Sequence, residues 1–179
     1  MTTLSNESYY IIFDNFRLDF KNLFSFALVN RHWCRIIIPI LWSEPYHKFR
    51  DLRLIRRLFL TLNVEEQTLL NSFIITLPYH QESPLFDYTS YIKYVSNDFY
   101  DGVNNWLSYT GCKVGHELKK AVNCSLIAMF LRTCKNLKHL SLDETICNRT
   151  IFQNLCVNTT ITSIDLYMSS LELKDGKQY

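Results

Sequence analysis

The side chains most able to bind a metal or carry catalysis are cysteines and histidines, and they are scattered along this chain. No two cysteines form a Cys-x-x-Cys pair, and no histidine stands at zinc-finger spacing from two of them. Cys112 and His116 are spaced to share a helical face, but two ligands are too few for a zinc site. We therefore predict reduced thiols and no metal site. The cysteines are Cys34, Cys112, Cys124, Cys134, Cys147 and Cys156, and the histidines are His32, His47, His80, His116 and His139.

Enzymatic chemistry would need a nucleophile with an orienting base, or paired carboxylates on rigid elements. The sequence shows no such spacing, and its four glycines give little backbone freedom for loops that cradle phosphate. We predict no catalytic residue, no cofactor and no enzymatic activity. Activity of the isolated chain that one cysteine or histidine substitution abolishes would contradict this prediction.

Composition limits the class of protein and of partner. The chain has 179 residues, 47% apolar and 20% charged, enough for a real core. A net charge of +2 gives no electrostatic case for nucleic acid or a membrane surface as the main partner. The N-terminus has no signal-peptide pattern, and no apolar run is long enough to span a membrane. We expect an intracellular soluble protein, cytoplasmic, nuclear or both.

The first forty-odd residues predict three short helices. A helical apolar stripe marks the first of them, which Ser5 or Asn6 can cap; it consists of Tyr9, Ile12, Phe13 and Phe16. The second points Leu23 and Ala27 inward, with Phe24 and Leu28 as further candidates. The third begins near Asn30, and Pro39 should end or distort it. Its inward residues are Trp33, Ile36, Ile37 and Ile40.

A module of this size has a marginal core without a staple or a partner. The second helix also carries apolar residues on more than one face, including Phe26 and Val29. These residues either pack on the rest of the chain or form a docking surface for another protein.

Three blocks of residues in this region carry a family resemblance. They are Leu4-Ser5-x-Glu7-x-Tyr9-x-x-Ile12-Phe13, Leu28-Val29-Asn30-x-x-Trp33 and Pro39-Ile40-Leu41-Trp42. In this order and register they resemble an F-box, particularly of the fungal type, with Ser5 where the family usually has proline. The resemblance implies a three-helix F-box over residues 1–46 that binds a Skp adaptor and, through it, a cullin scaffold. The contact positions that it implies are Leu4, Ser5, Ile12, Leu28, Val29 and Trp33.

Residues 47–120 are expected to form a helical bridging region, in which a divergent repeat is an open alternative. Apolar spacing predicts helices over 52–62, 65–72 and 101–109, and an apolar run predicts a strand over 73–77. Arg50, Arg53 and Arg57 share another helical face. That face is either solvated or meets an acidic partner surface, and the solvated alternative is the more common one.

The last third contains a repeat with a period of 24 residues. Leu137-x-x-Leu140-x-Leu142 returns as Ile161-x-x-Ile164-x-Leu166, and Ile127 and Leu131 of the preceding helix return as Ile151 and Leu155. The unit resembles a leucine-rich repeat, in which such strands lie parallel. Thr145 and Ser169 stand where that family usually has asparagine. Two unrelated βα segments that agree by chance are the alternative.

The resemblance implies a concave binding face between the inward leucines. Its candidate target-binding residues are Lys138, His139, Ser141, Asp143, Thr162, Ser163, Asp165 and Tyr167. We place these repeats in residues 121–179, with the last one incomplete.

Together these patterns predict a mostly α fold with short parallel strands, an α/β solenoid that follows an N-terminal F-box. The predicted function is that of a substrate-recognition adaptor in a Skp–cullin–F-box (SCF) ubiquitin ligase, with an unknown target protein. The alternative is an interaction module, or a truncated remnant, that is not coupled to a ligase.

Overall fold

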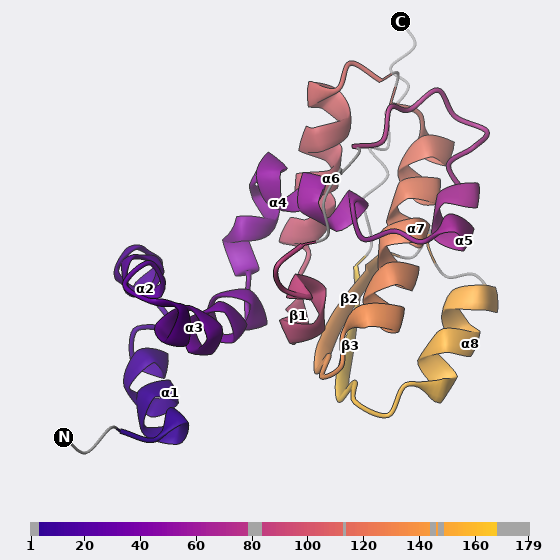
Figure 1. Ribbon diagram of the computed structural model, residues 1–179. Coiled ribbons are helices and arrows are strands. Elements are labelled where there is room, and N and C mark those ends of the chain that lie inside the picture. The colour runs from indigo at the N-terminus through magenta and orange to yellow at the C-terminus, as the bar shows by residue number, and fades with distance from the viewer. Residues whose placement is uncertain (1–3, 79–83, 113, 144–145, 147–148, 168–179) are drawn as a thin grey trace, which may run out of the picture.

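The chain adopts a mixed α/β fold that is mostly helical, with one small parallel sheet (Figure 1). The computed structural model describes residues 4–78, 84–112, 114–143, 146 and 149–167. Within these residues no helix is both long and apolar enough to cross a membrane.

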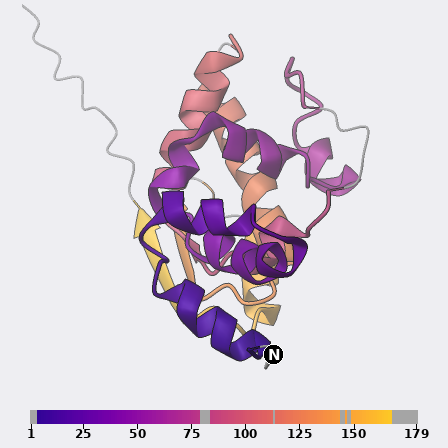
Figure 2. The same ribbon diagram turned by 60° about the vertical axis from the view of Figure 1, so that its left-hand side comes forward.

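The N-terminal helices form where the sequence supplies caps and apolar stripes. The side chains of Ser5, Asp19 and Asn30 cap the first turns of α1, α2 and α3 by accepting backbone N–H bonds. The three helices lie together at one side of the molecule, and α3 leads toward the rest (Figures 1 and 2). Their bounds are α1 Asn6–Asp14, α2 Phe20–Ala27 and α3 Arg31–Ser43.

A run of short helices follows, and one close approach fixes how they pack. Gly102 of α6 lies against the backbone of Phe49, whose carbonyl carbon would stand 2.8 Å from a Cβ added at Gly102. Only glycine lets these two backbones meet. The bounds are η1 Tyr46–Arg50, α4 Leu52–Phe59, α5 Val64–Thr68, η2 Tyr88–Tyr91 and α6 Asp98–Tyr109.

Three parallel strands in sequence order form the sheet, and helices connect them. β2 pairs with β3 in a register that joins His139 to Ser163 and Leu140 to Ile164, an offset of 24 residues. The predicted parallel pairing of the two repeat copies is therefore confirmed. The bounds are β1 Tyr94–Val95, α7 His116–Thr133, β2 His139–Asp143, α8 Arg149–Val157 and β3 Ser163–Tyr167.

One backbone hydrogen-bond pattern recurs at the start of each strand. The Lys93 carbonyl accepts the N–H groups of Lys138 and His139 at 2.8 and 3.0 Å, and the Lys138 carbonyl accepts those of Thr162 and Ser163 at 2.9 and 3.1 Å. The Ser43 carbonyl, the last of α3, accepts the N–H of Lys93 at 2.8 Å. This series of bonds links α3 directly to the sheet.

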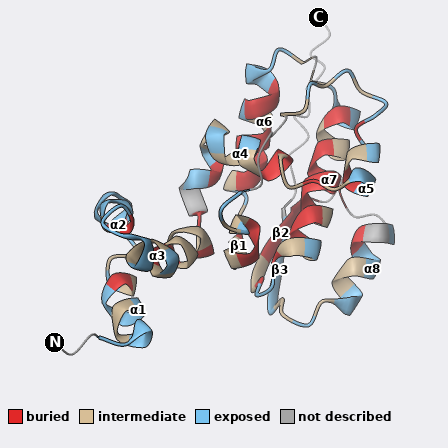
Figure 3. Cartoon of the chain, in the orientation of Figure 1, coloured by how far each residue is buried: buried red, intermediate tan, exposed pale blue. Residues whose placement is uncertain are grey.

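The buried apolar residues separate into two clusters (Figure 3). The small cluster lies among α1, α2 and α3 and has Phe13, Leu23, Ala27, Ile37 and Ile40 as its buried members. The large cluster includes residues of α6, α7, β1 and β2, whereas Ile164 and Leu166 of β3, which the repeat pattern expected to point inward, are 46% and 68% exposed. Because Ile40 belongs to the first and Trp42 packs against the second, α3 spans both.

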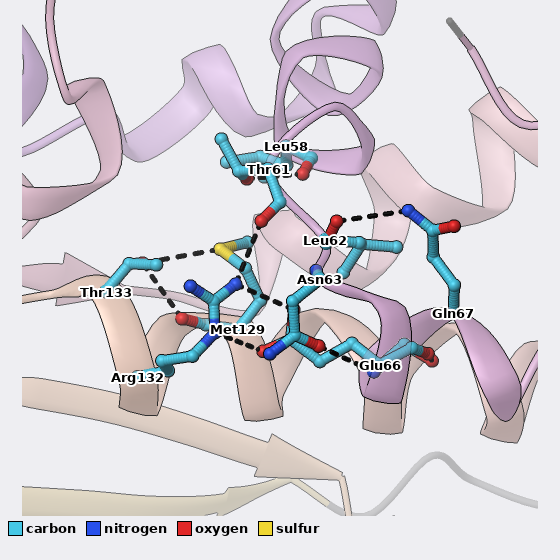
Figure 4. A network of polar contacts seen from close by, with 10 residues as sticks. Leu58, Thr61, Leu62, Asn63, Glu66, Gln67, Met129, Arg132 and Thr133 are labelled. Atoms are coloured by element: carbon cyan, nitrogen blue, oxygen red, sulfur yellow. Dashed lines mark hydrogen bonds and ion pairs between the residues drawn. The ribbon is translucent and has the colours of Figure 1, made fainter.

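A partly buried ion pair ties α5 to α7 (Figure 4). Glu66 and Asn63 form a reciprocal capping box at the start of α5. Arg132 of α7 donates to both Glu66 carboxylate oxygens at 2.7 and 2.8 Å and to the Thr61 carbonyl at 2.9 Å. The hydrogen bonds to Glu66 raise the pKa of the Arg132 guanidinium. Only 6% of the Glu66 side chain is exposed, so this carboxylate depends on its partner.

Some predicted elements differ in the structure. Pro39 does not end α3, since contacts on both sides of it, by Ile37 and by Trp42, hold the helix through to Ser43. The helix expected over 65–72 is shorter and covers Val64–Thr68. The strand expected over 73–77 is wrong, because the segment packs alternate side chains on the large cluster without pairing to a strand.

Candidate functional site

The positions that the F-box resemblance assigns to an adaptor lie at the start of α1 and on it, directly after α2, and in the first turn of α3. Ser5 is the N-cap of α1, and its Oγ accepts the backbone N–H of Ser8 at 3.3 Å. The apolar members are exposed: Leu4 by 53%, Ile12 by 43%, Leu28 by 71% and Val29 by 59%. Four apolar side chains thus remain in water beside a small core.

Trp33 differs from the other adaptor candidates because it is half-buried. Its ring meets the Phe13 ring edge-on, with centroids 5.0 Å apart, and the Tyr9 ring at 6.0 Å. The backbone N–H of Trp33 donates to Asn30 Oδ1 at 2.8 Å. Trp33 therefore supports the small cluster from inside and presents only part of its side chain to a partner.

Further exposed apolar side chains enlarge this part of the surface, and the sequence analysis missed them. Ile11 is 65% exposed, and Phe20 and Phe24 are 41% and 46% exposed. Phe24 and Leu28, the further candidates for the inner face of α2, are exposed, because Leu23 and Ala27 are buried there and Phe26 packs against the small cluster beside them. The spacing of Phe20, Phe24 and Leu28 at i, i+4 and i+8 is the signal that marks a second stripe.

The second candidate surface is a polar row across the three strands. Tyr94, His139 and Ser163 stand in register on β1, β2 and β3. The His139 ring stacks near Tyr94 at 6.3 Å between centroids, and its Nδ1 shares a 2.8 Å hydrogen bond with Ser163 Oγ. Asp165, two residues further along β3, has its Oδ2 3.7 Å from the other ring nitrogen of His139, Nε2. The 24-residue period could have revealed this grouping, since His139 and Ser163 are equivalent positions.

A serine, a histidine and an aspartate side by side invite comparison with a nucleophile and its base. The distance from His139 Nε2 to Asp165 is too long for a hydrogen bond, and the Asp165 side chain is 70% exposed. An aspartate that orients a catalytic histidine is buried and hydrogen-bonded to it. The row is thus better suited to contact a partner than to activate Ser163.

Two of the predicted face residues do not reach the surface. Ser141 and Asp143 are only 1% and 7% exposed, which corrects the expectation that they contact a target. The Tyr100 hydroxyl fills the space between them, donating to the Ser141 carbonyl at 2.8 Å and accepting from the Asp143 N–H at 3.0 Å. Ser141 Oγ also bonds the Asn97 side chain.

The remaining face residues lie along the strand starts. Lys138 is half-buried, and Thr162 is exposed, with its hydroxyl donating to the Lys138 carbonyl at 3.0 Å. Tyr167 ends β3 opposite Asp143, and its side chain lies outside the described residues. Thr145 and Ser169, where the repeat family has asparagine, also lie outside them.

The cysteine and histidine side chains bear on whether the chain holds a reactive thiol or a metal. Burial raises the pKa of the Cys134 thiol to about 12, which leaves it unreactive at neutral pH. Cys112 precedes α7 and His116 begins it, so the two do not share a helical face. Within the described part of the chain no three His, Cys, Asp or Glu side chains gather as a metal site would require.

Comparison of the chain with protein-family models, with curated proteins and with solved structures found no match. The two surfaces, one apolar on the N-terminal helices and one polar across the strands, are therefore the basis for inferring function.

Proposed function

We propose that this chain is a substrate-recognition adaptor of an SCF ubiquitin ligase. Its N-terminal F-box would dock on a Skp adaptor, and its strand surface would hold a target protein. The observation that carries this proposal is the exposure of Leu4, Ile12, Leu28 and Val29, the apolar positions that the F-box resemblance assigns to the adaptor.

The buried and the exposed apolar positions of the F-box-like motif support a division into core residues and adaptor-binding residues. Phe13 is 3% exposed and Ile40 2%, so these motif positions build the core of the three-helix region. The exposed ones have no such structural role, and apolar residues that gather on a surface mark a protein interface. A region with only five buried apolar residues would also gain stability from a partner that binds the folded state.

The strand surface supports the target-binding half of the proposal. Lys138, His139, Ser163 and Asp165 offer both charges and several hydrogen-bonding groups on a backbone fixed by the parallel ladder. Repeat scaffolds bind proteins through extended surfaces of this kind. The absence of enzymatic activity stays a prediction of the sequence.

Co-purification with a Skp adaptor tests the proposal. We expect the wild-type chain to bind, and a Leu28→Asp, Val29→Asp variant to lose at least about tenfold in affinity, because two charges would enter an apolar contact. Trp33 is unsuitable for this test, since its ring also supports the small cluster. Val64→Asp, at an equally exposed apolar residue on α5, is the matched control and should bind normally.

A folded, monodisperse wild-type chain that does not bind the adaptor would overturn the ligase proposal. The alternative, an interaction module that is not coupled to a ligase, would then remain. Equal loss of binding in the Val64→Asp control would show that the double variant acts through general destabilisation.

A further inference from the structure

A groove lies between the N-terminal helices and the rest of the chain, and of the two surfaces described above it shares only the exposed rings of Phe20 and Phe24. It encloses about 660 Å³, within the range of ligand and peptide pockets. Its walls come from α2, from the second half of α3 and from the η1–α4 segment together with η2. None of the six adaptor candidates and none of the strand-face residues lines it.

Aromatic rings form much of the groove lining. Phe20 and Phe24 stack with their planes 4° apart and centroids 6.2 Å apart, and each is more than 40% exposed. On the facing wall Trp42 packs against Tyr88 with centroids at 4.7 Å. The rest of the lining includes aliphatic Leu41. These side chains can accept a bulky apolar group.

Basic side chains stand around these rings. Lys48 Nζ lies 4.3 Å from the centre of the Phe20 ring, and the Arg57 guanidinium carbon lies 5.0 Å from that of Tyr88. Arg53, with its side chain 91% exposed, pairs with Asp51 at 2.7 Å. The groove thus holds three basic residues besides one acidic residue, with Lys48 and Arg57 placed over rings by cation–π attraction.

We propose that this groove binds a linear acidic segment of a partner protein, with one bulky apolar residue seated on the aromatic lining. Carboxylates of such a segment would meet Lys48, Arg53 and Arg57, and the charge complementarity would speed and orient its binding. The chain's net charge of only +2 disfavours nucleic acid as the occupant. This inference goes beyond the proposed function, because it concerns peptide binding by the chain itself whether or not an adaptor docks.

Fluorescence anisotropy with a defined probe tests this proposal on the full chain. The probe is a labelled acidic octapeptide with a central Trp-Leu pair, compared with the same peptide in which lysines replace the acidic residues. We expect saturable binding of the acidic peptide that weakens with salt, and no binding of the basic one. Arg53→Glu, Arg57→Glu should weaken binding at least about tenfold, as charge reversal at an interface does. Lys135→Glu, at an exposed lysine outside the groove, is the control.

Phe24→Ala probes the lining without changing charge and keeps the test decisive if the double variant does not fold. It should weaken the Trp-Leu peptide and leave unchanged the weaker binding of an acidic peptide that lacks both apolar residues. Equal binding by wild type, double variant and Phe24→Ala would overturn the proposal. So would equal binding of the acidic and basic peptides, or tight binding of an oligouridine probe that the acidic peptide does not displace.

Discussion

The three-helix region and the region around the sheet differ in how they use apolar residues. Among the residues that the structure describes, the first has five buried apolar residues and the second has 26. Figure 3 shows the same contrast, with buried residues concentrated in α6, α7 and β2. Both regions leave large apolar side chains exposed, such as Leu18 by 95% in the first and Leu85 by 85% in the second, but the first sets far fewer buried ones against them. The three-helix region is rich in apolar residues, but many of them are exposed and few are buried.

This difference indicates that the two regions have different tasks. A large, close-packed cluster holds the strand surface in place without a partner. A core of five buried residues is small for an independent module, and the exposed apolar side chains around it are what the proposed docking would use. Trp42 and Ser43 at the end of α3 join the two, through ring packing on Tyr88 and a backbone bond to Lys93.

The largest expected effect is on the large region, through Gly102. A Gly102→Val side chain would overlap the Phe49 carbonyl, and Ile55 Cδ1 is only 3.0 Å from a Cβ there. Two backbones would have to separate, so we expect a loss of at least about 3 kcal/mol in the free energy of unfolding. Urea denaturation followed by circular dichroism measures it. Gly115→Ala is the control, because nothing lies within 4 Å of its Cβ.

A substitution in the small cluster tests whether the regions are separable. Leu23 is fully buried, and Leu23→Ala should cost about 3 kcal/mol. We expect hydrogen exchange to rise in α1, α2 and the first half of α3 while α7 stays protected. The neighbouring Phe24→Ala, at a 46% exposed residue, should cost less than about 1 kcal/mol. Equal loss of protection in α7 would mean that the chain unfolds as one unit.

The Glu66–Arg132 pair contributes a smaller share within the large region. Arg132→Ala would leave a carboxylate that is 6% exposed without its cation, although Asn63 N–H still donates to it at 2.8 Å. We expect a loss of about 2 kcal/mol, less than for a fully buried pair because the Arg132 side chain is 42% exposed. Thermal unfolding should show that Arg132→Ala, Glu66→Gln recovers part of the loss. No recovery would mean that Arg132 acts by packing alone.

The local patterns of the sequence predicted much of this arrangement. Apolar spacing located α1 to α4 and α6, and Gly111 follows α6 with a φ of 71° as expected for a helix end. The 24-residue period predicted that the two repeat copies form parallel strands, and the observed register has the same offset. These features depend on side chains close in sequence or on a strict period.

What the sequence could not predict depends on distant contacts. β1 has only two residues, so its sequence gives little signal. The pattern Ile92-x-x-Val95 precedes Leu137-x-x-Leu140 by 45 residues, a spacing that differs from the 24-residue period and so conceals the relation. The burial of Ser141 and Asp143 follows from Tyr100, a residue of α6 more than 40 positions away. Phe73, Ile75 and Leu77 pack on the large cluster with alternate residues facing outward, as they would in a strand. The sequence pattern of a single segment does not tell whether a neighbouring strand is there to pair with it.

The smallest effect concerns Asp51, which caps α4 beside the groove that separates the two regions. Hydrogen bonds from the Arg53 side chain lower the pKa of the Asp51 carboxyl. Because its folded pKa lies below the unfolded value of about 3.9, Asp51 adds stability above that pH and loses it as the pH falls through the folded pKa.

Asp51→Ala should therefore cost about 1 kcal/mol at pH 7, as loss of a helix cap does, and progressively less in acid. Asp51→Asn keeps a capping oxygen but not the charge, so it should cost less at pH 7 and converge with wild type in acid. Urea denaturation from pH 7 to pH 3 measures both differences. A difference that does not shrink with falling pH would show that the charge on Asp51 contributes nothing and that only the cap stabilises α4.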